Sequence, residues 1–267
     1  MRFAWILIPV LAACWLFMGP ARGESKSAPD ADTAWLSDKS WDDGAAFVSV
    51  FRGRIQWYGE FREAEVRHYV VREFLDPDQL VKSDSPDDKS IPVIKANTLI
   101  SFNTGTYPYR QMATLFFHRK TGVLVKGMGT SQEGCGTSMQ RWDWSGTFRW
   151  DTYWDGEARG ERALAKPANL FFPEELPFVA GLLKPQSVEV LPPLVRSRIR
   201  PWTKSAGELT RDGRTTRIGK SEFRYDAGGF LESWTIPGRE EFRRVTKKKL
   251  YYWDYLRNGD EKVLGLK

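Results

Sequence analysis

Tight-turn signals recur along most of this chain, at intervals of about ten residues in its C-terminal third. Asp-Gly and Asn-Gly pairs are the strongest of them, because a type I′ hairpin turn needs positive φ at both central residues. The runs between the signals are rich in β-branched and aromatic residues, as strands are: Ile218–Tyr225, Phe230–Ile236, Phe242–Thr246, Leu250–Leu256 and Lys262–Leu266. This spacing predicts consecutive antiparallel hairpins.

The same pattern extends towards the N-terminus. Phe47–Phe51, Val66–Phe74 and Thr147–Trp154 alternate in part, which places Phe148 and Trp150 on an inward face. A helix is favoured only after Pro173, where proline and two glutamates precede an apolar run. We therefore predict a mainly β protein: a single domain, residues 39–267, built as a curved antiparallel sheet or open barrel with a short helical insert.

The N-terminus carries the signature of export. Arg2 is followed by the uncharged apolar run Ala4–Met18, and small residues precede a cleavage site after Gly23. We interpret residues 1–23 as a signal peptide and residues 24–38, which lack periodicity, as a disordered leader. Leu-Ala-Ala-Cys around Cys14 also matches a lipobox, so an outer-membrane lipoprotein is the alternative to a periplasmic or secreted protein.

The charge of the chain favours no nucleic-acid partner. The formal net charge is +6, and it falls by two when residues 1–23 are removed. The basic runs Arg196–Arg200 and Arg243–Lys249 are interleaved with apolar residues, so we interpret them as solvated strand faces. Contact with a membrane is expected only if Cys14 is lipidated.

Metal and cofactor signatures are missing from the sequence. It has two histidines, His68 and His118, and no HxH, HExxH, CxxC or phosphate-loop pattern. His68 lies in a strand-like run and His118 just before a turn, so both are expected to be ordinary strand histidines. We predict no metal and no cofactor.

Cys135 is the one candidate nucleophile of the mature chain. It lies between Gly134 and Gly136 after Gln-Glu, on a loop whose backbone amides can hold an oxyanion. A thiol enzyme would also need His68 or His118 beside the sulfur as a base. The alternative is a small buried residue where glycines let two strands approach, and we favour this alternative.

The block from Phe102 to Gly136 is the best place to look for a binding site. Two glycine-bearing turns, Thr104–Tyr109 and Ser131–Gly136, are joined by one out-and-back passage through the turn at Lys120-Thr121-Gly122. They are expected to meet at one end or on the concave face of the sheet. The candidate binding residues are the flat amphipathic and polar side chains of this region: Tyr107, Tyr109, Gln132, Glu133 and Trp57.

Four segments of this region carry a family resemblance: Trp57–Glu60, Pro92–Lys95, Thr104–Tyr109 and Ser131–Gly136. Together they resemble a family of exported bacterial proteins often labelled "septum formation inhibitor Maf". Members usually have Gln-Glu-Trp-Cys-Gly, where this chain has Gly134 in place of the tryptophan. True Maf nucleotide pyrophosphatases carry a Ser-Pro-Arg-Arg motif near the start, which this chain lacks, so the resemblance implies an exported domain and not that activity.

Three classes of function fit these observations. The first is a non-catalytic envelope protein whose curved sheet binds an apolar or amphipathic, lipid-like ligand or a partner protein, and the twelve tryptophans favour it. The second is a thiol-dependent hydrolase or transferase that uses Cys135. The third, a membrane-spanning barrel, is opposed by charged residues on both alternations of many strands. The first class is the prediction, and the second is its alternative.

Overall fold

The computed structural model describes residues 27–156, 158–198, 203–251, 253 and 264–265. The predicted signal peptide, with Cys14, lies outside the described residues. So do the Asn258-Gly259 turn and most of the predicted strands Leu250–Leu256 and Lys262–Leu266.

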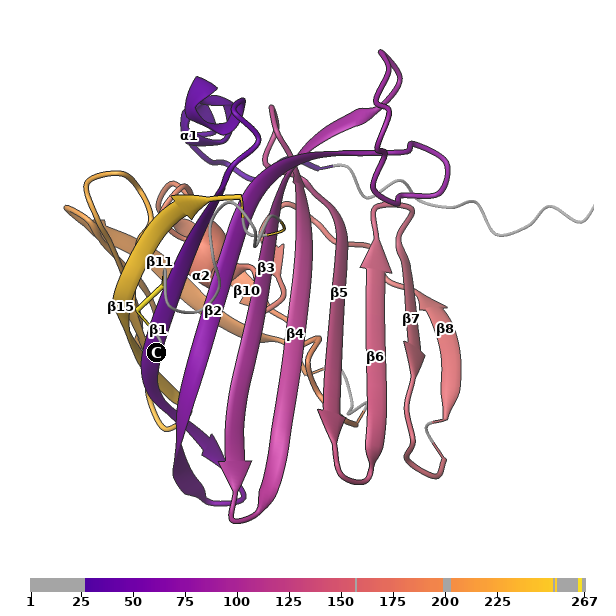
Figure 1. Ribbon diagram of the computed structural model, residues 1–267, viewed down its shortest axis with the longest axis vertical. Coiled ribbons are helices and arrows are strands. Elements are labelled where there is room, and N and C mark those ends of the chain that lie inside the picture. The colour runs from indigo at the N-terminus through magenta and orange to yellow at the C-terminus, as the bar shows by residue number, and fades with distance from the viewer. Residues whose placement is uncertain (1–26, 157, 199–202, 252, 254–263, 266–267) are drawn as a thin grey trace, which may run out of the picture.

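One sheet contains every strand that the structure describes. It has 15 strands in the order β8-β7-β6-β5-β4-β3-β2-β1-β15-β14-β13-β12-β11-β10-β9, and only the β9–β10 pair is parallel (Figure 1). The strands are β1 Ala46–Trp57, β2 Glu60–Leu75, β3 Ile91–Thr104, β4 Tyr107–His118, β5 Leu124–Glu133, β6 Gly136–Asp143, β7 Thr147–Asp151, β8 Arg159–Ala163, β9 Leu170–Phe171, β10 Gln186–Val190, β11 Ser205–Asp212, β12 Thr215–Ile218, β13 Ser221–Tyr225, β14 Leu231–Ile236 and β15 Glu240–Leu250.

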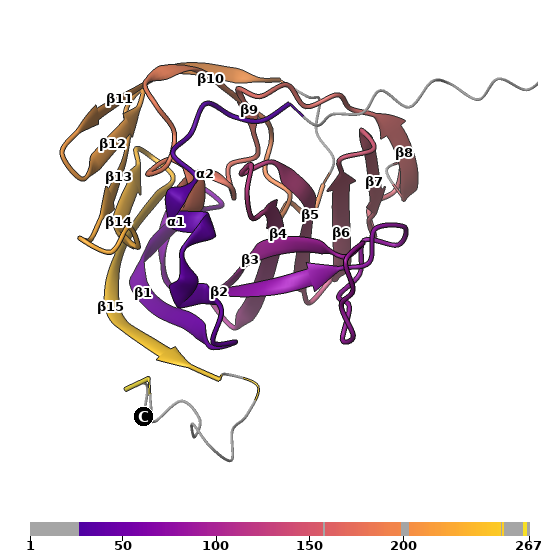
Figure 2. The same ribbon diagram turned by 90° about the horizontal axis from the view of Figure 1, so that it is seen from above.

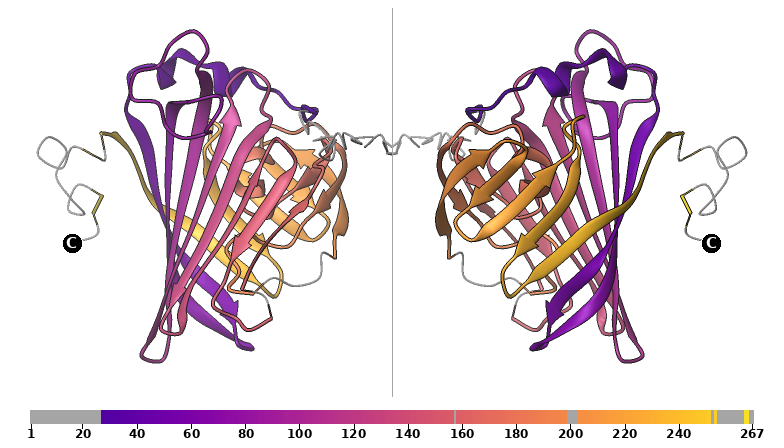
Figure 3. Two further views of the ribbon diagram at one scale, coloured as in Figure 1. Left: turned by 90° about the vertical axis from the view of Figure 1, so that its right-hand side faces the viewer. Right: turned by 90° about the vertical axis from the view of Figure 1, so that its left-hand side faces the viewer.

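The order of the strands follows a simple path. The chain winds outward from β1 to β8, crosses to β9 at the opposite edge, and returns strand by strand until β15 pairs with β1. The sheet stays open between β8 and β9, and it curls strongly around an interior (Figure 2). Figure 3 shows the long strands β1–β4 crossing the shorter C-terminal strands on the other side of that interior.

Alternating side chains make the two faces of this sheet. On β4, Tyr109, Gln111, Ala113, Leu115 and Phe117 are all buried, and every second residue along a strand points to the same face. Tyr109, Leu115 and Phe117 belong to the main hydrophobic cluster, which fills the concave face. Smaller clusters bury parts of the convex face, one of them formed around Leu75, Val93, Phe116 and Val125.

Residues 172–185, between β9 and β10, and residues 191–198, between β10 and β11, fill the interior; together we call them the interior segment. Its apolar side chains complete the main cluster, and its single helical turn, α2 (Leu176–Val179), lies inside the curve of the sheet. The predicted helix after Pro173 is therefore confirmed but is only four residues long. Pro177 in its first turn is compatible with a helix, and Gly181 packs against the Tyr225 ring, where a Cβ would lie 2.9 Å away.

Ordered structure begins earlier than the predicted boundary at residue 38. Ala31 bridges to Leu183, and a short helix, α1 (Ala34–Ser37), precedes a 3₁₀ turn, Lys39–Trp41. Leu36 is 1% exposed, and the Trp35 ring meets Trp41 edge-on at 4.9 Å. The aromatic and apolar side chains of this turn cap one end of the interior. The free energy of their burial outweighs the tendency of the polar residues before them to stay disordered.

The prediction of a mainly β single domain with a curved antiparallel sheet is confirmed. Two details were wrong. Ile218–Tyr225 is not one strand, because Gly219 has φ of +57° and turns the chain between β12 and β13. The run from Arg196 is not a strand face within the described residues, because residues 191–198 cross the concave face as an irregular segment held by side chains.

Gly53 on β1 tests the pairing of β1 with β15. A Cβ at Gly53 would lie 1.9 Å from the Glu241 carbonyl oxygen of β15, so the two backbones can approach only if residue 53 has no side chain. We expect Gly53→Ala to lower the free energy of unfolding by roughly 2 kcal/mol or more in urea denaturation. The exposed neighbour Arg52→Ala should change it by no more than about 0.5 kcal/mol, and equal effects of the two variants would contradict this account.

Candidate functional site

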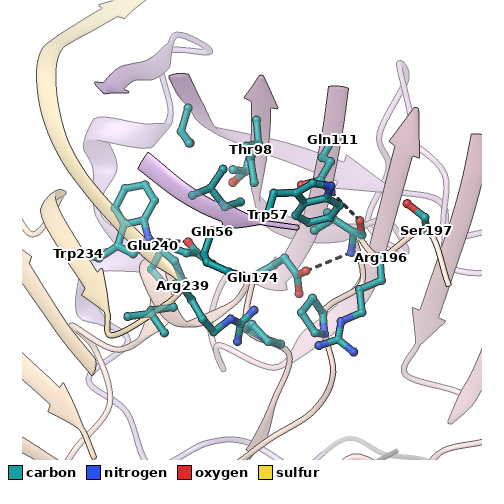
Figure 4. Close-up of a pocket in the computed structure, with 18 of the residues that line it drawn as sticks. Gln56, Trp57, Thr98, Gln111, Glu174, Arg196, Ser197, Trp234, Arg239 and Glu240 are labelled. Carbon is teal, nitrogen blue, oxygen red and sulfur yellow. Dashed lines mark hydrogen bonds between the residues drawn. The ribbon is translucent and has the colours of Figure 1, made fainter. Parts of the chain in front are cut away.

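A cavity of about 500 Å³ lies between the concave face of the sheet and the interior segment. Pockets of this size are typical of small-molecule sites. The sheet supplies one wall from β1–β4 and β14–β15, and the interior segment supplies the other (Figure 4). The apolar lining consists of Ile55, Trp57, Val66, Ile100, Pro173, Pro177, Pro193, Val195, Trp234 and Ile236.

Strand register gives this cavity two different ends. The turns β1–β2, β3–β4, β5–β6 and β14–β15 all lie at one end of the sheet, which we call the hairpin end. Tyr58 and Arg239 line the cavity there. His68 and Thr98 are paired with each other in the middle of β2 and β3 and line the deep end. His68 lies eight residues from the start of β2, or about 26 Å along an extended strand.

Residues 191–198, which we call the strap, form the inner wall. Polar side chains of β4–β6 hold its backbone: Gln111 Nε2 donates to Val195 O at 3.2 Å, Gln140 Nε2 to Arg196 O at 2.9 Å and Ser138 Oγ to Ser197 O at 2.8 Å. The strap also lies against Gly129, where a Cβ would lie 2.4 Å from the Leu194 carbonyl. These contacts fix the strap on the sheet and set the width of the cavity.

Glu174 reaches into the cavity from the interior segment (Figure 4). Its Oε1 accepts the Val195 N–H at 3.2 Å, while its Oε2 is buried without a hydrogen-bond partner. Burial away from water raises the pKa of this carboxyl to about 7, although backbone N–H groups of residues 174, 194 and 195 oppose the shift. Glu174 therefore exchanges its proton near neutral pH, in contact with the strap.

His68 behaves differently at the deep end. Burial lowers its pKa to about 4, so the imidazole is neutral at physiological pH. Its ring stacks with Trp234 at 5.9 Å and meets Phe51 at 4.9 Å. His68 therefore adds a flat, uncharged surface to the wall.

The hairpin end of the cavity is basic and aromatic. Arg196, Arg198 and Arg239 line it together with Tyr58 and Trp154. The Arg198 guanidinium lies over the Trp154 ring, 4.3 Å from its centre. Two carboxylates share this end: Glu133, which accepts the Tyr153 hydroxyl, and Glu240, which accepts the Trp234 N–H at 2.9 Å.

The two predicted glycine-bearing turns do meet. The β3–β4 and β5–β6 turns lie side by side at the hairpin end, with Arg110 paired to Gln132, and the Tyr107 hydroxyl donates to Cys135 Sγ at 2.8 Å. This hydrogen bond is the largest of the effects that raise the pKa of Tyr107 to about 12. Gly134 packs against Tyr107, where a Cβ would lie 2.6 Å from the ring.

The predicted binding residues of this region divide between the cavity and the surface. Trp57 and Glu133 line the cavity. Tyr109 is 1% exposed, stacks with Phe102 at 4.9 Å and shares a hydrogen bond with the Tyr58 hydroxyl at 2.8 Å, so it supports Trp57 from behind. Tyr107 is half-buried and Gln132 is exposed, and neither lines the cavity.

Cys135 differs from the favoured expectation, because its thiol is exposed and not buried. Neither histidine is near it. His118 lies at the opposite end of β4 from Tyr107, about 36 Å away along the strand, and its Nδ1 meets Thr121 Oγ1 at 3.0 Å. His68 is three strands from β5, or about 14 Å in that direction alone. The structure thus provides no histidine base for a Cys135 nucleophile.

Sequence reasoning missed Glu174, the strap and the three arginines. The available signal was the proline-rich stretch around Pro173 and Pro193, of which only the short helix after Pro173 was predicted. A pair of glutamates in an otherwise apolar segment that has to be buried is the feature that could have identified Glu174.

Among the residues that the structure describes, no group of three or more His, Cys, Asp or Glu side chains is placed to hold a metal ion. Within the same residues, no helix is both long and apolar enough to cross a membrane. Comparisons of the chain with protein-family models, curated proteins and solved structures found no match. The geometry of the cavity is therefore the basis for a functional proposal.

The raised pKa of Glu174 predicts that the free energy of unfolding depends on pH. Its pKa in the folded protein is above the ordinary value of 4.5, so the fold retains a proton that the unfolded chain releases. Stability is therefore lost as pH rises from about 4.5 to about 7, by about 3 kcal/mol in total. We expect urea denaturation between about pH 5 and about pH 8 to show this loss in the wild type relative to Glu174→Gln.

Glu208 on β11 is exposed and provides the matched control. The Glu208→Gln variant should follow the wild-type pH profile. Parallel profiles for wild type and Glu174→Gln would contradict the buried, proton-retaining state of Glu174.

Proposed function

We propose that this chain is an exported, non-catalytic binding protein that holds an apolar or amphipathic small molecule in the cavity on the concave face of its sheet. The cavity itself is the observation that supports the proposal. It has the volume of a small-molecule site, and its lining combines apolar and aromatic surfaces with polar and charged groups at defined positions.

The walls of the cavity are built to remain in place without a ligand. The strand wall is part of a continuous sheet, and the strap is held by three side-chain hydrogen bonds from β4 and β6. Hydrogen bonds to a fixed backbone of this kind contribute about 1 kcal/mol each. A preformed site binds without the ordering cost that a collapsed site has to meet.

The alternative, a thiol-dependent hydrolase or transferase, has less support. Cys135 is exposed at the hairpin end, but its sulfur meets a tyrosine hydroxyl and neither histidine. Tyr107, with its pKa raised to about 12, keeps its proton at neutral pH. It therefore cannot act as the general base that would remove the proton of the Cys135 thiol. We therefore place the function in the cavity.

Export is the part of the proposal that concerns residues 1–23. Mass spectrometry of the protein purified from its native host is expected to find Glu24 as the first residue, because the apolar run and small residues before it form a signal-peptidase site. A diacylglyceryl group on Cys14 would instead establish a lipoprotein. An intact Met1 on the mature protein would contradict export by either route.

Filling the cavity should weaken binding. Thr98 lies on β3 at the deep end, and its side chain faces the cavity. We expect Thr98→Trp to reduce the affinity for the fluorescent apolar probe N-phenyl-1-naphthylamine by about tenfold or more, because the indole occupies the volume that the probe needs. Fluorescence titration of the probe measures this directly.

Leu99, the next residue on β3, gives a matched control because adjacent strand residues face opposite sides of the sheet. Leu99→Trp adds the same ring outside the cavity and should leave the probe affinity within about twofold of wild type. Binding that is unaffected by Thr98→Trp, in a variant with unchanged circular dichroism, would place the probe elsewhere and remove the support for the proposal.

A further inference from the structure

The two ends of the cavity differ in chemistry, and the difference specifies a ligand class. We infer that the cavity takes an amphipathic anion, with the apolar tail at the deep end and the acidic head group at the hairpin end between Arg198 and Arg239. This inference rests on the proposed function and adds to it the charge and the orientation of the ligand.

The indole N–H of Trp234 donates to Glu240, and the deep end otherwise has no charged side chain among its described residues to receive a head group. Its lining there comes from Val66, Thr98, Trp234 and the neutral His68, with Pro177 of the interior segment opposite. Glu174 lies between the two ends and, below its pKa of about 7, is uncharged as well. Burial of an alkyl chain against such surfaces is favourable, whereas a charged group would lose its hydration without compensation.

Arg198 and Arg239 reach the hairpin end from separate parts of the chain. Arg239 belongs to the β14–β15 turn, which is fixed to β1 because the Gln56 N–H donates to the Arg239 carbonyl at 2.7 Å. Arg198 follows Ser197, whose carbonyl is held by Ser138 of β6. Both arginines are exposed, and both line the cavity.

Some exposed arginines on the outer surface have carboxylate partners, whereas Arg198 and Arg239 have none among the described residues. Arg54 meets Glu241 at 2.9 Å and Arg217 meets Glu222 at 2.9 Å. Arg198 and Arg239 form no ion pair with any carboxylate of the described residues. Their donors are therefore available to a ligand.

The remaining charges at this end do not compete for these donors. Arg196 adds a third positive charge to the lining. Glu133 is engaged by the Tyr153 hydroxyl, and Glu240 by the indole N–H of Trp234. The Arg198 guanidinium also lies over the Trp154 ring, and this contact reduces the freedom that the side chain would lose on binding an anion.

Three ligands with the same alkyl chain test the inference: decyl sulfate, decyltrimethylammonium and 1-decanol, each measured below its micelle concentration by displacement of N-phenyl-1-naphthylamine at low salt. We expect decyl sulfate to bind roughly tenfold tighter than decyltrimethylammonium, because charge-assisted hydrogen bonds to arginine form only with the anion. This preference for the anion should shrink at high salt, since the hairpin end of the cavity is exposed to solvent.

The double variant Arg198→Gln/Arg239→Gln should lower the affinity for decyl sulfate by roughly tenfold and leave that for 1-decanol within about twofold. Arg217→Gln, an exposed arginine of β12 on another part of the sheet, is the matched control and should change neither. Both arginine sites are exposed, so circular dichroism and the melting temperature should stay at their wild-type values.

Two outcomes would overturn the inference in different ways. Equal affinity for the three ligands, unchanged in the double variant but lost in Thr98→Trp, would leave an apolar cavity with no selectivity for anions. Tighter binding of decyltrimethylammonium would show that the carboxylates, and not the arginines, determine the charge preference at the hairpin end. If none of the three ligands displaces the probe from the wild-type protein, the proposed function fails together with the inference.

Discussion

The pairing of β1 with β15 is the interaction on which the rest of this structure depends. It joins two sets of strands that are otherwise connected only through the crossing from β8 to β9, and it pairs Ala46 with Leu250 across almost the whole described chain. Closing so long a loop is entropically unfavourable, so the other hairpins have to contribute to the same cooperative unit. Gly53 and the bulge between Val50 and Phe51 allow the two strands to approach and bend where the sheet turns from one set to the other.

A sheet curled in this way has a concave face that has to be covered, and the chain covers it with its own interior segment. The cover is apolar near α2 and polar along the strap, and the sheet matches it: apolar residues face α2, while Gln111, Ser138 and Gln140 face the strap carbonyls. Buried polar side chains on a concave sheet face would be destabilising without these partners. The cavity is the part of the concave face that neither region fills.

The sequence predicted the local pattern of this fold better than its long-range contacts. Turn residues such as Gly122 and Gly213 and the alternation around Phe148 were sufficient to predict hairpins and an antiparallel sheet, because these features depend on φ and on a period of two. The pairing of β1 with β15 could not be predicted from the same signals, because register between distant strands leaves no local pattern. A short helix after Pro173 was predicted, but its place inside the sheet depends on a curvature that appears only when all strands are assembled.

The candidate site was likewise predictable from the sequence only in part, because it is assembled by contacts between distant segments. Residue type and the expected meeting of two turns selected Trp57 and Glu133, which line the cavity. The same criteria also selected Tyr107 and Gln132, and neither lines it. From the sequence, Glu174 is predictable only as part of a helix start. Its raised pKa comes from burial, and burial cannot be inferred from amino-acid composition.

Burial also explains why the cavity is electrostatically asymmetric although its lining includes both acidic and basic residues. It shifts the two most enclosed titratable groups towards their neutral forms: the pKa of His68 falls to about 4 and that of Glu174 rises to about 7. Arg198 and Arg239 at the hairpin end are exposed to water. The hairpin end presents three arginines together with Glu133 and Glu240, and the interior behind it is almost uncharged. This difference in hydration between the two ends is the physical basis of the orientation that we propose for an amphipathic ligand.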